Sequence, residues 1–400
     1  MTDADFSDDN RWMLPEGVDE LLPPRARALE QLRRRVLDTY ASWGYELVMP
    51  PTIEYLDSLL TGTGRDLELQ TFKLTDQLSG RLLGVRADMT PQAARIDAHK
   101  LRREAPVRLC YVGTVLHTRP EGPGQSRNPV QVGAELYGHS GIESDVEIID
   151  LMLETLRLAD IDAPHLDLGH VGIFRGLAAG AGLNADLESR LFEALQRKAR
   201  PEIGELLAAV PDTGARERLA ALCELNGGPD VLDAAVERLS GASETVQEAL
   251  RHLRALASRL GHRHPGMTLH FDLAELAGYQ FHTGVVFAAF VPGRGREVAR
   301  GGRYDEIGRV FGRARPATGF SADLKQLLAV TGEDGSGWTT ANGILAPWSD
   351  DPALLREIRR LRDAGERVVL ALPGETLPQD GPYDRHLVAQ DGCWKLEPLN

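Results

Sequence analysis

The sequence predicts an α+β protein, in which segments rich in strands and segments rich in helices follow one another in blocks. Three observations support this prediction. Short β-type runs are concentrated between Gly80 and Gly138, residues 186–262 are almost continuously helical in pattern, and β-type runs return from Met267 onward. Blocks of strands separated by blocks of helices are typical of the α+β class.

The first predicted element is a long amphipathic helix that begins after Pro23 and Pro24 and ends near Gly44. Proline is favoured in the first turn of a helix, and apolar residues recur at helical spacing along this segment. A short strand follows, and the pair Pro50 and Pro51 ends it. The first pattern in the chain is therefore helix, strand and proline.

The middle of the chain predicts a second long helix and then a helical insertion. Ser144 is expected to be the N-cap of the second helix, because a serine oxygen there can accept a hydrogen bond from a free backbone N–H group. Helical runs separated by glycine and proline then fill residues 186–262. We interpret them as a helical subdomain inserted into a core that spans residues 1–330.

The end of the chain predicts a small, separate α/β domain over residues 338–400. The glycine-rich segment TGEDGSGWTT marks a boundary near residue 335, and the residues after it read as strand, helix, strand and hairpin. This tail is acidic, and so is the whole chain, with a formal net charge of -14. Proteins that bind nucleic acid normally present a clustered basic face, so we expect no contact with tRNA.

The composition excludes several other classes of protein. The opening MTDADFSDDN is polar and acidic, and no stretch of apolar residues is long enough to cross a bilayer, so we expect a cytoplasmic protein with no membrane contact. The three cysteines are far apart, which argues against disulfides and a zinc ribbon. His262 and His264 fall in a predicted loop without a carboxylate partner, so neither a metal nor a cofactor is expected.

Three short motifs are rich in polar and aromatic side chains: QVGAE at residues 131–135, YQFHTGVVF at 279–287 and GGRYD at 301–305. Gln131 and Glu135 lie on the same face of a predicted strand, because side chains alternate with a period of two. Carboxylates, amides and hydroxyls can bind an ammonium group, and an imidazole ring requires a partner at each nitrogen.

The order of these motifs, together with VRADMTP before them and GFSADLKQL after them, resembles the catalytic core of class II aminoacyl-tRNA synthetases. The histidyl-tRNA synthetase family is the most similar, over about residues 13–328. This resemblance implies an antiparallel sheet flanked by helices and a histidine pocket. The pocket residues that it implies are Asp88 and Thr90 for the ammonium group, Gln131 and Glu135 on the strand, Phe281 and His282 beside the imidazole, and Arg303 and Tyr304 in the wall. The alternative is that these polar side chains only satisfy one another beneath the sheet.

The same resemblance indicates that the ATP site is degenerate. Adenylation concentrates negative charge, which active enzymes of this type stabilise with fixed cations. Here His117 occupies the place of the motif 2 arginine, Arg119 that of the following glutamate, Gln326 that of the motif 3 arginine and Ala277 that of the arginine that contacts the carboxylate. Arg119 or Arg127 could in principle replace the motif 2 arginine. We nevertheless predict no catalytic residues in this chain.

A synthetase core with a histidine pocket, without adenylation cations and with a short acidic tail is similar to the regulatory subunits of ATP phosphoribosyltransferase. That resemblance implies assembly with a short catalytic phosphoribosyltransferase subunit, a role in the first step of histidine biosynthesis, and feedback inhibition by L-histidine. It also implies a homodimer built through the first helix-strand-proline segment. Two alternatives stay open: an active histidyl-tRNA synthetase with a divergent ATP site, and a dimeric scaffold that binds no ligand.

Overall fold

A computed structural model describes residues 12–61, 65–120, 122, 125–274, 281–330, 343–374, 383–390 and 392–399. These residues fall into two compact units, one with residues 12–20 and 31–330 and the other with residues 21–30 and 343–399. The predicted domain boundary near residue 335 lies outside the described residues. Within the described ranges, no helix has both the length and the apolar character needed to cross a membrane.

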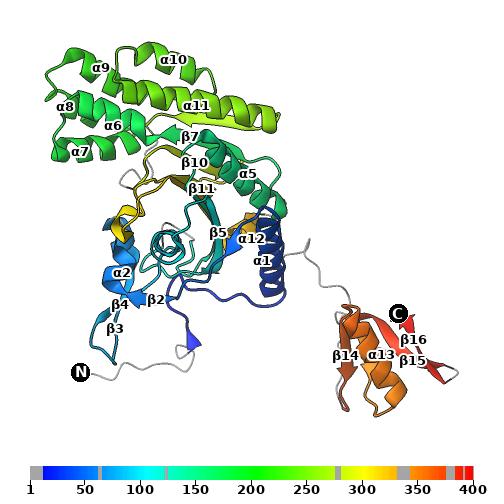
Figure 1. Ribbon diagram of the computed structural model, residues 1–400. Helices are drawn as coiled ribbons and strands as arrows, with labels where there is room; N and C mark the ends of the chain where they lie inside the picture. Colours follow the sequence, from blue (N-terminus) through cyan, green and yellow to red (C-terminus); the bar gives the residue numbers. More distant parts are fainter. Residues whose placement is uncertain are drawn as a thin grey trace. The chain divides into compact units, whose positions relative to one another are not determined.

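A large sheet forms the centre of the first unit (Figure 1). The strands in the middle of this sheet pair antiparallel with their neighbours, and one parallel pairing follows on each side of them. The prediction of an α+β fold with an antiparallel sheet is confirmed. In spatial order the strands are β1 (Glu46–Leu47), β5 (Val107–Thr114), β6 (Val130–Tyr137), β12 (Ala317–Asp323), β11 (Glu297–Arg303), β10 (Val285–Phe290), β7 (His165–His170), β9 (Thr268–Asp272) and β8 (Asn226–Gly227).

Two long helices cover one face of this sheet. The predicted first helix is α1 (Arg25–Ser42), and the second is α5 (Ile142–Leu158). The Tyr40 ring of α1 packs edge-on against Phe320 of β12 with 6.3 Å between the centroids, and its hydroxyl lies 2.9 Å from Oγ1 of Thr155 on α5. Because Phe320 faces these helices, its neighbours Gly319 and Ser321 face the opposite side of the sheet.

The start of α5 differs from the prediction. Gly141 is the N-cap residue, and Ser144 lies inside the first turn. The Ser144 hydroxyl donates to the carbonyl oxygens of Gly141 and His139, at 2.7 and 3.1 Å. It therefore closes the loop before the helix instead of capping the helix itself.

The inserted segment is helical, as predicted. Apart from the two-residue strand β8, it consists of α7 (Ala185–Gln196), α8 (Arg200–Leu207), α9 (Thr213–Ala221), α10 (Val231–Arg238) and α11 (Glu244–Arg263). These helices gather with α6 (Val171–Gly180) at the end of the sheet near β7 (Figure 1).

The longest helix of the insertion, α11, extends further than predicted, so that His262 lies within it and His264 follows it directly. The expectation that this histidine pair lacks a carboxylate partner is wrong, because His264 Nε2 lies 2.6 Å from Oδ1 of Asp150 on α5.

Shorter elements surround this framework. A small antiparallel sheet contains β2 (Ile53–Tyr55), β4 (Leu82–Val85) and β3 (Phe72–Thr75), and the remaining helices of the unit are α2 (Leu56–Leu60), α3 (Arg65–Gln70), α4 (Thr90–Arg95) and α12 (Leu324–Val330). A π-helix over Ile96–Leu101 continues α4, and Arg309–Phe311 form a 3₁₀ turn. Helix α4 contacts β6 and brings residues 88–90 to the central sheet.

Among the described residues from 343 to 399, the second unit forms a four-stranded sheet and the helix α13, in the predicted order. Its strands are β14 (Val368–Ala371), β13 (Gly343–Pro347), β15 (Tyr383–Gln390) and β16 (Cys393–Pro398), and its helix is α13 (Pro352–Asp363). Asp351 caps α13 by accepting a hydrogen bond from the N–H of Ala353, as expected for an aspartate before a first-turn proline. Leu354, Ile358 and Leu361 of this helix are buried in a core with Ile344 and Leu387 of the sheet.

Candidate functional site

Two paired glycines, which we call the glycine floor, lie on the face of the sheet opposite α1 and α5. Gly302 of β11 and Gly319 of β12 stand directly opposite each other, so both lack a side chain at the same place. A methyl group on Gly319 would come within 1.7 Å of Glu135 Oε2 and 2.6 Å of the Tyr304 hydroxyl. A methyl group on Gly302 would come within 2.8 Å of His282 Nε2. Glycine at both positions therefore makes room for three side chains of the predicted pocket.

Glu135 and Tyr304 hold polar atoms over this floor without partners. Both residues are buried, and neither Glu135 Oε2 nor the Tyr304 hydroxyl has a hydrogen-bond partner among the described residues. Burial raises the pKa of the Glu135 carboxyl well above its ordinary value; a hydrogen bond from Tyr111 opposes this shift, and the nearby Asp88 carboxylate adds to it. Buried polar groups in folded proteins almost always have a partner, so these two atoms mark a place for a polar ligand.

Asp88, Thr90 and Gln131 form a second polar group at one end of the floor. Asp88 Oδ1 accepts hydrogen bonds from Gln131 Nε2 at 2.7 Å and from the N–H of Thr90 at 3.0 Å. Gln131 Oε1 accepts from the N–H of Met89 at 2.9 Å. The structure thus brings these three predicted residues together in one fixed arrangement.

Tyr111 joins the two groups, and the sequence analysis did not identify it. This fully buried hydroxyl donates to Glu135 Oε1 at 2.8 Å and lies 2.9 Å from Oγ1 of Thr90. It fits because Gly133 stands opposite it in β6, where a methyl group would come within 2.5 Å of the hydroxyl oxygen. The signal was the pairing of a strand tyrosine with a glycine, which becomes visible only once the register is known.

Phe281 and His282 add two rings to the same side. Their ring centroids are 4.2 Å apart, and the His282 ring lies 6.3 Å from that of Tyr304. His282 is buried, whereas the Phe281 side chain is 41% exposed. His282 therefore lines the interior of the site and Phe281 forms its rim.

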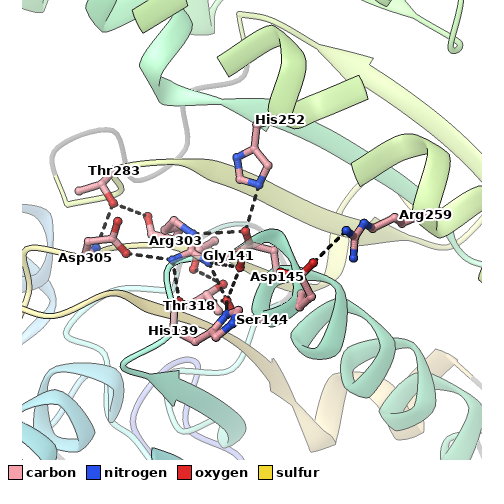
Figure 2. A network of polar contacts seen from close by, with 12 residues as sticks. His139, Gly141, Ser144, Asp145, His252, Arg259, Thr283, Arg303, Asp305 and Thr318 are labelled. Atoms are coloured by element: carbon pink, nitrogen blue, oxygen red, sulfur yellow. Dashed lines mark hydrogen bonds and ion pairs between the residues drawn. The ribbon is translucent and has the colours of Figure 1, made fainter. Parts of the chain in front are cut away.

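Arg303 is directed away from this cluster, although we predicted it in the pocket wall. It pairs with Thr318 in the strand register, on the face opposite Gly302, and its guanidinium group reaches the start of α5 (Figure 2). There Arg303 Nη2 lies 2.9 Å from Asp145 Oδ1 and donates to Ser144 Oγ at 2.8 Å. Adjacent residues of a strand point to opposite faces, which separates the Arg303 side chain from that of Tyr304.

Two of the predicted ATP-site positions bind the backbone of the chain itself. His117 is buried and its Nε2 lies 2.9 Å from the carbonyl oxygen of Ala87, while Gln326 Nε2 donates to the carbonyl oxygen of Glu297 at 2.8 Å. Arg119 is exposed, and Ala277 lies outside the described residues. Arg127 donates to the carbonyl oxygens of His117 and Glu16, at 3.0 and 2.9 Å.

The N-terminal segment neutralises the lysine beside Gln326. Lys325 Nζ lies 3.0 Å from Asp19 Oδ1, and the Lys325 side chain is largely buried. Asn128, in the segment before β6, donates to the carbonyl oxygen of Asp19 at 2.8 Å. Lys325, which directly precedes the motif 3 position, is therefore already paired with a carboxylate of the chain itself.

Comparisons with known proteins show the family of this chain. The family model described as Histidyl-tRNA synthetase matches residues 17–327, and the one described as ATP phosphoribosyltransferase subunit HisZ C-terminal domain matches residues 341–397. The ATP phosphoribosyltransferase regulatory subunit of Alkalilimnicola ehrlichii is 63% identical, with 100% of both chains covered. The chain belongs to the family of ATP phosphoribosyltransferase regulatory subunits. A second member, from Thioalkalivibrio sulfidiphilus, is 61% identical over 92% of this chain and 93% of its own.

Solved structures place this regulatory subunit family among class II synthetase folds. A Bacillus halodurans protein described as an ATP phosphoribosyltransferase regulatory subunit/histidyl-tRNA synthetase superimposes with a TM-score of 0.80 at 28% identity, over 92% of this chain and 94% of that chain. Histidyl-tRNA synthetase from Nostoc gives a TM-score of 0.74 at 18% identity over 94% and 91%, and supports the fold alone. The predicted class II fold and the predicted regulatory role are both confirmed.

Proposed function

We propose that this chain binds L-histidine at the glycine floor and, through it, inhibits a catalytic ATP phosphoribosyltransferase subunit with which it assembles for the first step of histidine biosynthesis. The observation that carries the proposal is the pair of unpartnered buried atoms, Glu135 Oε2 and the Tyr304 hydroxyl. A neutral imidazole has one N–H donor and one acceptor nitrogen, and a carboxylate and a hydroxyl complement it. Asp88, Thr90 and Gln131 form the polar group that we propose binds the ammonium group of histidine.

The regulatory effect follows from thermodynamic linkage. A ligand that binds one conformation of an assembly more tightly shifts the assembly toward that conformation, by no more than the difference in its affinities. The family name places the catalytic reaction on a partner subunit, so histidine bound here would act on the partner through their interface. Cytoplasmic location remains a prediction.

Isothermal titration calorimetry with L-histidine tests this proposal, first on the chain alone and then with a short-form catalytic subunit. Activity of the assembly with and without histidine is measured in parallel. Histidine binding together with loss of activity supports the proposal. A chain that binds no histidine in either setting would leave the ligand-free scaffold as the better description.

We expect no activation of histidine by this chain. Each missing cation costs on the order of 3 kcal/mol of transition-state stabilisation, and His117 and Gln326 stand at two positions where the resemblance implies arginine. Exchange of radiolabelled pyrophosphate into ATP, measured with histidine, should therefore stay at the level of the enzyme-free blank. Exchange above that level that depends on histidine would favour the synthetase alternative.

We propose that the chain forms a homodimer through the segment that follows α1. Its apolar side chains are unusually exposed, with Met49 at 76%, and an exposed apolar patch of this kind is typical of a protein interface. The exposed residues are Trp43, Leu47, Met49, Ile53 and Tyr55.

Met49→Glu should weaken this homodimer by at least about tenfold, because it would bury a charge in an apolar contact. Sedimentation velocity measures the change. Val236→Glu, at an exposed apolar position on α10, is the control and should leave the association unchanged. A Met49→Glu protein that sediments as a dimer like the unmodified chain would contradict this interface.

A further inference from the structure

The guanidinium group of Arg303 connects the end of β11 to the start of α5 through an unusually complete set of contacts (Figure 2). Besides Asp145 and Ser144, it donates to the carbonyl oxygens of Gly141 and His139, both at 3.3 Å, and to Asp305 Oδ1 at 3.2 Å. Arg303 and Asp145 are both buried. A buried guanidinium that is satisfied on every side holds its surroundings in one geometry.

The backbone around Arg303 carries two rings of the pocket. Tyr304 is the next residue, and the carbonyl oxygen of Arg303 accepts a hydrogen bond from the N–H of Thr283 at 2.7 Å. Thr283 follows His282 directly, and its hydroxyl accepts from the N–H of Asp305 at 2.9 Å. The position of Arg303 therefore determines where both Tyr304 and His282 stand.

The helical insertion reaches the same network through α11. His252 Nε2 lies 3.2 Å from Asp145 Oδ2, and this same oxygen accepts a hydrogen bond from Arg303 Nε at 3.3 Å, while Asp145 Oδ1 lies 2.9 Å from Arg303 Nη2. The ring of His170, 5.5 Å from that of His252, packs against it. Burial lowers the pKa of His170 to about 3, so this ring is neutral and adds no charge. Asp145 is thus the joint between the insertion and the strand that leads into the pocket.

A second contact runs from the same side of the molecule to the pocket. Arg175 of α6 donates from Nη2 to the carbonyl oxygen of His282 at 3.2 Å. Helix α6 packs against α11 and contacts β10, whereas α11 contacts α5 and β7. The sequence assigned no role to the helical insertion, and the contact of His252 with Asp145 links it to the residues that hold the pocket.

We propose that Arg303 is a positioning residue through which the helical insertion sets the shape of the histidine pocket. We call Arg303, Asp145 and His252 the Arg303 latch. Movement of α11 relative to α5 would change the contact of His252 with Asp145. The buried Asp145–Arg303 pair would then have to move together, because separating a buried ion pair costs several kcal/mol of free energy. Anything that binds the insertion would then change histidine affinity, and histidine would reciprocally change binding at the insertion. The affinity readout rests on the proposed histidine site.

Substitutions of His252 test the latch without touching the pocket. His252→Ala should weaken histidine binding by between about threefold and thirtyfold, the range typical of residues that couple two sites without contacting the ligand. His252→Gln retains an N–H donor for Asp145 and should restore most of the affinity. Arg259→Ala is the matched control, because it removes another ion pair between α11 and α5, the 2.8 Å contact with Glu143, and leaves Arg303 untouched (Figure 2).

Amide hydrogen exchange at Thr283 provides a readout that needs no histidine. Its N–H donates to the Arg303 carbonyl, so His252→Ala should accelerate exchange at Thr283, and Arg259→Ala should not. Unchanged exchange at Thr283 in His252→Ala, or equal effects of the two alanine variants, would overturn the proposal. A wild-type chain that binds no histidine would reject the proposed function, and the exchange experiment would still decide on the latch.

Discussion

Gly319→Ala is expected to abolish measurable binding of L-histidine. The added methyl group would stand 1.7 Å from Glu135 Oε2 and 2.6 Å from the Tyr304 hydroxyl, so both side chains between which we place the imidazole ring would have to move. Glu135 is fully packed on its other side by the Tyr111 hydroxyl, so it has little room to retreat. Overpacking of this kind costs about 1–3 kcal/mol in a folded core. Here the side chains that must move are the ones that we propose bind the ligand.

Calorimetric titration with histidine measures this loss, and thermal unfolding measures the accompanying change in stability. Gly204→Ala is the control, because a methyl group at this position in α8 would meet nothing within 4 Å. It should leave histidine binding unchanged. A folded Gly319→Ala protein that binds histidine with undiminished affinity would show that the ligand does not lie over the glycine floor.

Glu135→Gln should weaken histidine binding by about tenfold to 100-fold, as expected when a buried hydrogen bond to the ligand is lost and its partner is left unsatisfied. Glu135 Oε1 accepts a hydrogen bond from Tyr111, and Glu135 Oε2 lies over the glycine floor without a partner among the described residues. The glutamine side chain has only one acceptor oxygen. This oxygen can accept a hydrogen bond from Tyr111 or from the ligand, but the NH2 group then faces the other partner. Feedback inhibition of the assembled enzyme should require correspondingly more histidine.

A second glutamate offers a matched comparison for this variant. Glu147 on α5 also accepts a hydrogen bond from a tyrosine, Tyr45, at 3.0 Å, but it lies on the face covered by the long helices and pairs with Arg108. Glu147→Gln should reduce the stability of the chain without changing histidine affinity. If both variants bound histidine like the unmodified chain, Glu135 would have no role in recognition.

The sequence could predict the pocket strand because its chemistry is local. Gln131 and Glu135 share a face through simple alternation, and the structure pairs them with Asp323 and Gly319 on the neighbouring strand. The bounds of α1 were predictable for the same reason, since the prolines before it and Gly44 after it act within a few residues.

The misplaced residues depend on distant partners. Arg303 forms an ion pair with Asp145, which is 158 positions away in the chain. No local sequence pattern predicts which face of the strand packs against α5. Ser144 looked like an N-cap because serine is favoured at that position, whereas the true N-cap, Gly141, has no side chain that could accept a hydrogen bond. Tyr111 was overlooked because its role depends on the register that puts Gly133 opposite it.

The central claim is that histidine binds between Glu135 and Tyr304. The most direct test is a ¹⁵N spectrum of ring-labelled L-histidine titrated with the unmodified chain and with Tyr304→Phe. We predict that the unmodified chain shifts the resonances of both ring nitrogens, and that Tyr304→Phe removes the shift at one of them. Identical spectra of free histidine and of histidine mixed with the unmodified chain would contradict the claim.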